Sequence, residues 1–66
     1  MEPIVNLEEK ILQDLVDAGA DVRIITTNGY QTKATVIDFD SEVIIAQVDG
    51  ERWMVYRHAV STIVFD

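Results

Sequence analysis

The chain contains no cysteine, so neither a disulfide nor a thiolate metal site can stabilise it. It has a single histidine, His58, which leaves only Ser61 or a carboxylate as a partner in a nucleophile–base pair. No nucleophile elbow, phosphate-binding glycine loop or metal-ligand spacing occurs in the sequence. We therefore expect a protein that is not an enzyme and that uses no cofactor or metal.

Long apolar runs are also missing. No run approaches the roughly 18 residues that span a bilayer, and the start, Met1-Glu2-Pro3-Ile4, lacks the basic and long apolar regions of a signal peptide. By exclusion, we expect no membrane association and a cytoplasmic location.

Basic residues are scarce. Only 5 lysines and arginines stand against 12 acidic residues, which gives a formal net charge of −7. Nucleic-acid-binding proteins usually carry a basic patch, so any binding of a polyanion must depend on local geometry here.

With 66 residues the chain is expected to be one domain, residues 1–66. Because so small a domain buries only about 60% of its unfolded surface, and 48% of the residues are apolar, we expect it to bury further surface against copies of itself.

The first apolar pattern has helical spacing: Leu7, Ile11, Leu12, Leu15 and Val16. Asn6 is a suitable N-cap, Glu9 completes a capping box, and Gly19 supplies a C-terminal stop. These signals predict a helix from about Leu7 to Ala18. A helix of this length is marginal alone, so its apolar stripe should lie on a sheet.

From Asp21 onward the period changes to two, which predicts five strands over residues 21–27, 30–39, 42–48, 51–56 and 60–65. Asn28-Gly29 and Asp49-Gly50 predict two-residue hairpin turns. The long second strand should bend sharply to serve both halves of a barrel. The expected fold is mainly β, an N-terminal helix followed by a strongly bent, five-stranded antiparallel open barrel. Its last two strands are apolar and unguarded by proline or lysine, so they should pair with another chain or aggregate.

Three residues between those strands, Arg57-His58-Ala59, fit neither run and predict a tight turn. The arginine fork and a histidine that titrates near neutral pH suit phosphates and base edges. The alternative is a solvated turn with a simply hydrogen-bonded histidine.

A second pattern, Asp38, Asp40 and Glu42, places three carboxylates on one face of an extended segment. They could bind a hard cation, although a solvated acidic turn is the preferred interpretation.

The sequence Tyr56-Arg57-His58-Ala59-Val60-Ser61-Thr62 resembles the second Sm motif of the bacterial Sm-like RNA chaperone family Hfq. The family has lysine at the position of Arg57 and isoleucine at that of Val60. Asn6-Leu7, Asn28-Gly29 and Phe39-Asp40 also stand at the family's separations, so the resemblance covers nearly the whole chain. It implies an SH3-like (Sm-like) barrel, a homohexameric ring, RNA binding and a role in post-transcriptional regulation.

The resemblance implies two RNA faces. Glu8 and Glu42 replace a glutamine and an aromatic residue of the family's proximal pore, and Ile25 replaces an aromatic residue of its distal face. The implied positions for uridine-rich RNA at the pore are Arg57, His58, Glu8, Ser41 and Glu42. Those for adenine-rich RNA at the distal face are Gly29, Tyr30, Ile25, Lys33 and Thr62.

In the family, the fourth strand pairs with the fifth strand of the next subunit. The implied ring interface is Trp53, Val55, Tyr56, Val60, Thr62 and Val64, although Trp53 and Tyr30 could instead form an aromatic platform. Two hypotheses follow. The first is an RNA-binding ring resembling Hfq. The second, motivated by the acidic charge, is an Sm-like ring with little RNA affinity that binds protein or acts as a scaffold.

Overall fold

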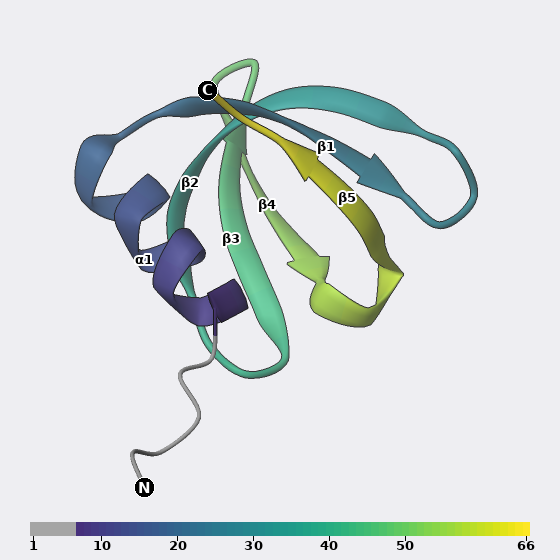
Figure 1. The fold of residues 1–66 in the computed structure, drawn as a ribbon. Helices are drawn as coiled ribbons and strands as arrows, with labels where there is room; N and C mark the ends of the chain where they lie inside the picture. The colour runs from purple at the N-terminus through teal and green to yellow at the C-terminus, as the bar shows by residue number, and fades with distance from the viewer. Residues whose placement is uncertain (1–6) are drawn as a thin grey trace, which may run out of the picture.

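The computed structural model describes residues 7–66, so the expected N-cap at Asn6 lies outside the described range. The elements in chain order are α1 (Leu7–Ala18), β1 (Asp21–Thr26), β2 (Gln31–Phe39), β3 (Val43–Val48), β4 (Glu51–Tyr56), the 3-10 turn η1 (Arg57–Ala59) and β5 (Val60–Val64). Figure 1 shows the helix lying against one side of a strongly curved sheet. The predicted helix and five antiparallel strands are confirmed, with strand ends shifted by one residue at most.

Helix α1 ends at Gly19, whose φ of +60° is the left-handed conformation that glycine adopts without strain. The N–H of Gly19 donates to the carbonyl of Val16 at 3.2 Å, and the N–H of Ala20 donates to that of Leu15 at 3.3 Å. These bonds satisfy two of the last four carbonyls of the helix and confirm the predicted stop. No helix within residues 7–66 is long and apolar enough to cross a membrane.

The apolar stripe of α1 packs on the sheet, except for its first member. Leu12 and Leu15 are buried, while Ile11 and Val16 are partly buried against the same core. Leu7, which the spacing assigns to the stripe, is 64% exposed. That assignment is wrong because helical spacing gives the direction of a side chain but not how far the sheet extends beneath the first turn.

The five strands form one antiparallel sheet in the order β4-β3-β2-β1-β5. Within the described residues, β4 and β5 are therefore its two edges and do not pair with each other. The register of β2 against β3 shifts between Val36 and Asp38, and that of β1 against β5 shifts between Ile25 and Thr26. A bulge bends the strand and increases its twist, so these two irregularities give the sheet the curvature expected of β2.

The core lies between the sheet and α1. Its side chains are apolar, and no polar or charged residue among those described is buried. The buried members are Leu12, Leu15, Val22, Ile24, Ala34, Val36, Ile44, Ala46 and Val48.

The first hairpin differs from the predicted two-residue turn. The N–H of Thr26 donates to the carbonyl of Tyr30 at 2.8 Å, so the loop has three residues, Thr27-Asn28-Gly29. Gly29 has a φ of +89°, whereas Asn28 does not have a positive φ, and a two-residue type I′ turn needs both. The Asn28 side chain explains the difference, because its Oδ1 accepts the Tyr30 N–H at 3.2 Å and the Thr26 hydroxyl.

The second hairpin follows the prediction. Val48 lies opposite Glu51, which leaves Asp49-Gly50 as a two-residue loop. Both loop residues have positive φ, 52° for Asp49 and 81° for Gly50. This is the backbone of a type I′ turn.

Candidate nucleic-acid interface

The turn η1 is held between two other loops of the molecule. The N–H of Arg57 donates to the carbonyl of Glu42 at 2.9 Å, which ties the turn to the β2–β3 loop. At the other end, the N–H of Thr27 donates to the carbonyl of Ala59 at 2.8 Å, which ties it to the first hairpin. The predicted tight turn is therefore present, and its position is set by two segments distant in sequence.

The guanidinium of Arg57 is occupied by groups of its own subunit. Nη2 lies 2.7 Å from Oε1 of Glu8, and Nη1 lies 3.6 Å from Oε2 of Glu9. Nη1 also donates to the backbone carbonyl of Asp40 at 2.6 Å, and the group lies 5.9 Å from the centre of the Phe39 ring. The Arg57 side chain is only 10% exposed. It therefore joins the start of α1 to the β2–β3 loop rather than presenting a free fork of donors.

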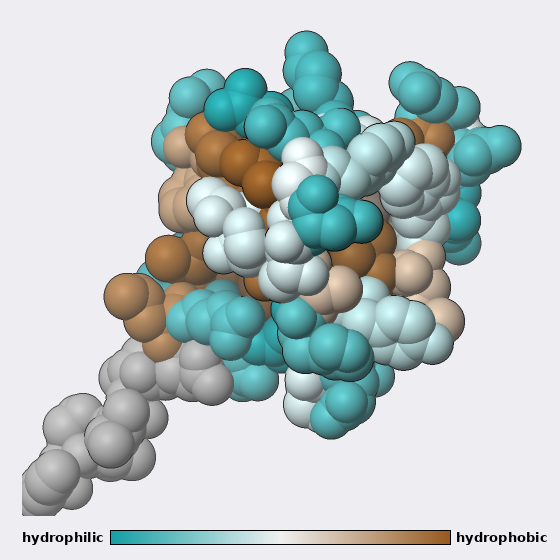
Figure 2. Space-filling model, turned by 90° about the vertical axis from the view of Figure 1, so that its right-hand side faces the viewer, coloured by the Kyte–Doolittle hydropathy of each residue, from teal (hydrophilic) through white to brown (hydrophobic). Residues whose placement is uncertain are grey.

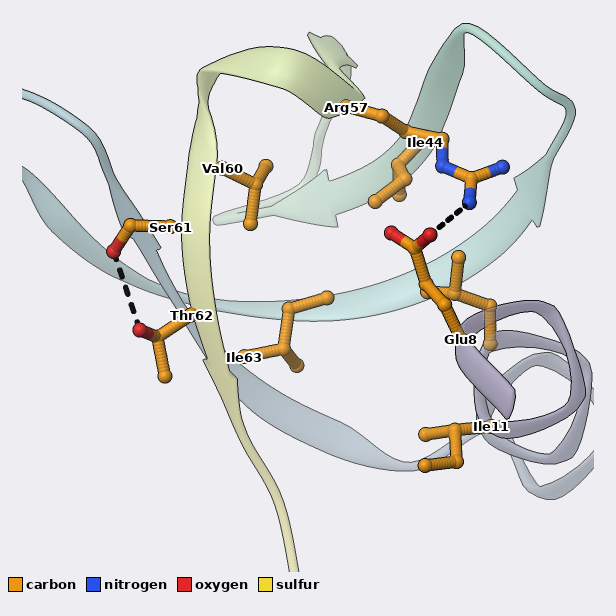
Figure 3. Close-up of a pocket in the computed structure, with 9 residues that line it drawn as sticks. Glu8, Ile11, Ile44, Arg57, Val60, Ser61, Thr62 and Ile63 are labelled. Atoms are coloured by element: carbon orange, nitrogen blue, oxygen red, sulfur yellow. Dashed lines mark hydrogen bonds and ion pairs between the residues drawn. The ribbon is translucent and has the colours of Figure 1, made fainter. Parts of the chain in front are cut away.

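A small cavity of about 190 Å³ lies beside this ion pair, between α1 and β5. Figure 3 shows Arg57 and Glu8 joined across its rim, with Ile11, Ile44 and Ile63 around its walls. Its lining is mainly apolar, which suits a flat ring or an apolar side chain better than a phosphate. The full lining is Glu8, Ile11, Leu12, Ile44, Arg57, Val60, Ser61, Thr62 and Ile63.

His58 remains open to solvent, unlike Arg57. Its ring lies 5.8 Å from that of Tyr56, at an interplanar angle of 30°. Ser41 and Glu42 are also exposed, on the β2–β3 loop. Of the five implied pore residues, the structure thus joins Arg57 to Glu8 and leaves the other three as solvent-facing side chains.

The β2–β3 loop is preorganised by Asp40. Its Oδ1 accepts the N–H of Glu42 at 2.7 Å and that of Val43 at 2.9 Å. These two backbone hydrogen bonds, together with the nearby charge of Arg57, hold the pKa of the Asp40 carboxyl below its usual value. The carboxylate therefore serves to fix the loop on which Ser41 and Glu42 stand.

The cation-binding interpretation of the acidic stretch is not supported by the geometry. Asp38 turns back to accept the N–H of Phe39 at 2.8 Å, and Asp40 caps its own loop. Among residues 7–66, no group of three or more histidine or carboxylate side chains could hold a metal ion.

Three of the five distal positions share the outer face of the sheet. Ile25 on β1 lies directly opposite Thr62 on β5, and Lys33 lies on β2 opposite Arg23, two residue pairs further along. Because Val22 and Ile24 point into the core, alternation turns Ile25 outward together with the side chains opposite it.

Tyr30 is oriented differently. Its ring is stacked on that of Trp53, with centroids 6.4 Å apart and an interplanar angle of 21°. Tyr30 is 53% exposed, so part of its ring remains open to solvent. Tyr30 and Trp53, with Gly29 in the adjacent loop, therefore form an aromatic surface at the end of the hairpin that is distinct from the outer-face positions Ile25, Lys33 and Thr62.

The edge strand β4 alternates between inward and outward side chains. Trp53 lies opposite Ala46 and Val55 opposite Ile44, and both of these partners are buried. Trp53 and Val55 therefore point towards the core. Met54 points outward and is 57% exposed; sequence analysis did not assign it to the interface, although strand alternation places it beside the assigned Tyr56.

The remaining interface positions are divided in the same way. Tyr56 on β4 is 52% exposed and Val64 on β5 is 39% exposed, whereas Val60 packs partly against the core. Thr62 is exposed. Figure 2 views the molecule from the side of the first hairpin and η1. On this face, apolar residues (brown) are exposed between polar residues (teal). Both edges of the sheet thus combine unpaired backbone with exposed apolar side chains.

Comparison with known proteins gives a consistent family. The family model described as Hfq protein matches residues 7–66. The "RNA-binding protein Hfq" of Desulforamulus reducens is 39% identical over 62 residues, covering 94% of this chain and 78% of that protein. The protein of the same name from Desulforudis audaxviator is 39% identical over 59 residues, covering 89% of this chain and 71% of that protein.

A solved structure agrees with this comparison. The 1.55 Å crystal structure of the pleiotropic translational regulator Hfq matches with a TM-score of 0.87 and 27% sequence identity. The match covers 89% of this chain and 98% of the other.

Proposed function

This chain belongs to the Hfq family, and from that membership we propose that it is an Sm-like protein that binds RNA and regulates gene expression after transcription. The observation that carries the proposal is the extent of the family match, which includes the helix, all five strands and the second motif. The alternative, a ring with little RNA affinity that acts as a scaffold, is not favoured, because the relatives compared above are named RNA-binding proteins.

We further propose that the protein acts by binding, without catalysis or a cofactor, as a closed ring of six copies in the cytoplasm. The support for a ring lies in the edges of the sheet. Within the described residues β4 and β5 have free backbone groups on their outer sides, and such edges associate readily. Pairing β4 of one subunit with β5 of the next is a head-to-tail contact, which generates a ring when the rotation closes.

We assign the principal RNA contact to the outer face of β1, β2 and β5, where Ile25, Lys33 and Thr62 lie, with Gly29 and Tyr30 at the adjoining hairpin. This is the face proposed for adenine-rich RNA. Lys33 forms no ion pair within the described residues, so its charge is available to a phosphate.

The pore is the weaker of the two faces. Arg57 is held by Glu8 at 2.7 Å, so an RNA phosphate must compete with a carboxylate already in place. The exposed Glu42 adds a negative charge and provides no aromatic surface for a base. His58 and Ser41 are left as the solvent-facing donors for uridine-rich RNA.

Titration of labelled oligoadenylate and oligouridylate over a series of salt concentrations tests this function. We expect oligoadenylate to bind more tightly, and both affinities to fall as salt rises because phosphate contacts displace counterions. Absence of binding to either oligomer at low salt, with an assembly shown to be intact by sedimentation, would overturn the proposal. Tighter binding of oligouridylate would overturn the assignment of faces.

A further inference from the structure

The outer face of the sheet carries a pair of like charges at directly opposed positions. Arg23 on β1 lies opposite Lys33 on β2, and both residues are exposed. Like charges opposite each other destabilise an antiparallel pair. The arrangement is unexpected in a chain with 12 acidic and 5 basic residues, and an anion bound between the two side chains would remove the repulsion.

The described residues of the subunit, 7–66, do not neutralise these two charges. Lys10 has Asp14 at 3.2 Å and Arg57 has Glu8 at 2.7 Å. Within residues 7–66, neither Arg23 nor Lys33 has a carboxylate within ion-pair distance. The pair is therefore a local positive site on a protein whose overall charge is negative.

An open groove of about 400 Å³ connects this pair to the C-terminal segment. Val64 lies opposite Arg23 in the pairing of β1 with β5, and Phe65 follows it with 44% of its surface exposed. Cationic side chains beside an exposed aromatic ring are the combination that holds single-stranded nucleic acid, since the cations contact phosphate and the ring stacks on a base.

Two carboxylates, Asp21 and Asp66, also line the groove. Oδ1 of Asp21 accepts the hydroxyl of Thr35 at 2.8 Å, which directs that oxygen along the sheet. Carboxylate oxygens accept hydrogen bonds from ribose hydroxyls and base amino groups, but they repel a compact anion. The groove therefore suits a nucleotide, in which phosphate and hydrogen-bond donors are separated, better than free phosphate.

We propose that this groove binds one nucleotide of single-stranded RNA, with its phosphate between Arg23 and Lys33 and its base against Phe65. The proposal rests on the proposed function and extends the RNA path from Ile25 and Thr62 along β1 and β5. Lys33 then acts together with Arg23, a residue to which sequence analysis assigned no role.

Matched double variants test the phosphate contact. Arg23→Gln/Lys33→Gln and Lys10→Gln/Arg52→Gln each remove two positive charges per chain, and all four residues are exposed. In oligoadenylate titrations over a salt series, the first variant should bind more weakly. Its plot of log affinity against log salt should be less steep by about 1 for each groove that the RNA occupies, because Arg23 and Lys33 hold one phosphate and each lost phosphate contact lowers the slope by about 1. The second variant should keep the wild-type slope.

Phe65→Leu tests the base contact. It keeps the charge and an apolar side chain but removes the stacking surface, so affinity should fall at least about fivefold with the salt slope unchanged. Sedimentation and thermal unfolding of each variant verify that assembly and fold are retained.

The results separate the two proposals. If the wild-type protein binds RNA and the two double variants have equal slopes, the groove is not a phosphate site, while the RNA-binding function stands. If Phe65→Leu binds as the wild type does, the proposed base contact is wrong. If the wild-type protein binds no RNA, both the function and the groove proposal are overturned.

Discussion

The guanidinium of Arg57 lies 2.7 Å from the carboxylate of Glu8, which joins the turn after β4 to the first turn of α1. Family resemblance implies that these two positions contact RNA separately, yet here they neutralise each other. Because the Arg57 side chain is only 10% exposed, the pair is partly shielded from solvent and holds two distant segments together.

Replacing Glu8 with glutamine should strengthen the binding of oligouridylate. The substitution keeps the length of the side chain and removes the charge that competes with phosphate for Arg57. We expect an affinity gain of about fivefold, equivalent to about 1 kcal/mol, the upper range for surface ion pairs, because Glu8 is exposed while Arg57 is largely shielded. Fluorescence anisotropy at fixed salt measures it. Asp14→Asn is the matched control, since Asp14 lies on the same helix, forms an ion pair with Lys10 and is also 64% exposed. Equal affinities of the two variants would show that Glu8 does not limit the pore.

Replacing Arg57 with glutamine should reduce stability as well as binding. The guanidinium donates to the carbonyl of Asp40 at 2.6 Å and pairs with Glu8, and hydrogen bonds to charged groups contribute about 1.5–3 kcal/mol. We expect the free energy of unfolding to fall by about 2 kcal/mol, measured by urea denaturation at constant protein concentration. Arg52→Gln, an exposed position on β4, should change it by less than about 0.5 kcal/mol. Coincident urea curves for the two variants would contradict a structural role of Arg57.

A charge on the outer side of β4 should separate the subunits without unfolding them. Met54 is 57% exposed on this edge strand, so Met54→Asp should give folded monomers if β4 pairs with another subunit. Val55→Asp should instead disrupt the fold, because Val55 lies opposite Ile44, which is 2% exposed, and the carboxylate would face the core. Sedimentation and circular dichroism distinguish these results. Leu7→Asp, at a residue that is 64% exposed on α1, should leave the assembly intact; a wild-type assembly in Met54→Asp would argue against a β4 interface.

Acid should lower the stability of the protein by protonating Asp40, which holds the β2–β3 loop in place. The N–H groups of Glu42 and Val43, with the charge of Arg57, lower the pKa of Asp40 in the folded protein. A group whose pKa is lower when folded contributes stability above its unfolded pKa, about 3.9, and loses that contribution as pH falls through the folded pKa. The midpoint temperature of thermal unfolding, measured between neutral pH and about pH 2.5, should therefore fall less steeply below about pH 4 for Asp40→Asn than for the wild type. Asp38→Asn is the control, because it removes one carboxylate from the same segment. If the plot of midpoint temperature against pH for Asp40→Asn runs parallel to that of the wild type, Asp40 does not have this role.

The amino-acid sequence by itself determined the elements of this protein and their order. The helical spacing from Leu7 to Val16, the stop at Gly19 and the period of two from Asp21 are local patterns, and the structure reproduces α1 and the five strands from them. Asp49-Gly50 formed the expected turn because both residues could adopt positive φ without help from elsewhere. The motif around Arg57-His58 was also recognisable, since a short run of residues carries it.

Only the tertiary structure decided which side chains meet. Arg57 faces Glu8, and Arg23 faces Lys33, because register and loop position bring together residues that no local period relates. The first hairpin gained a third loop residue because the Asn28 side chain bonds back to its neighbours, a contact that competes with the two-residue turn. Hydrophobic periodicity specifies the direction of each side chain within its own element, whereas the charge that it meets depends on how the elements are packed.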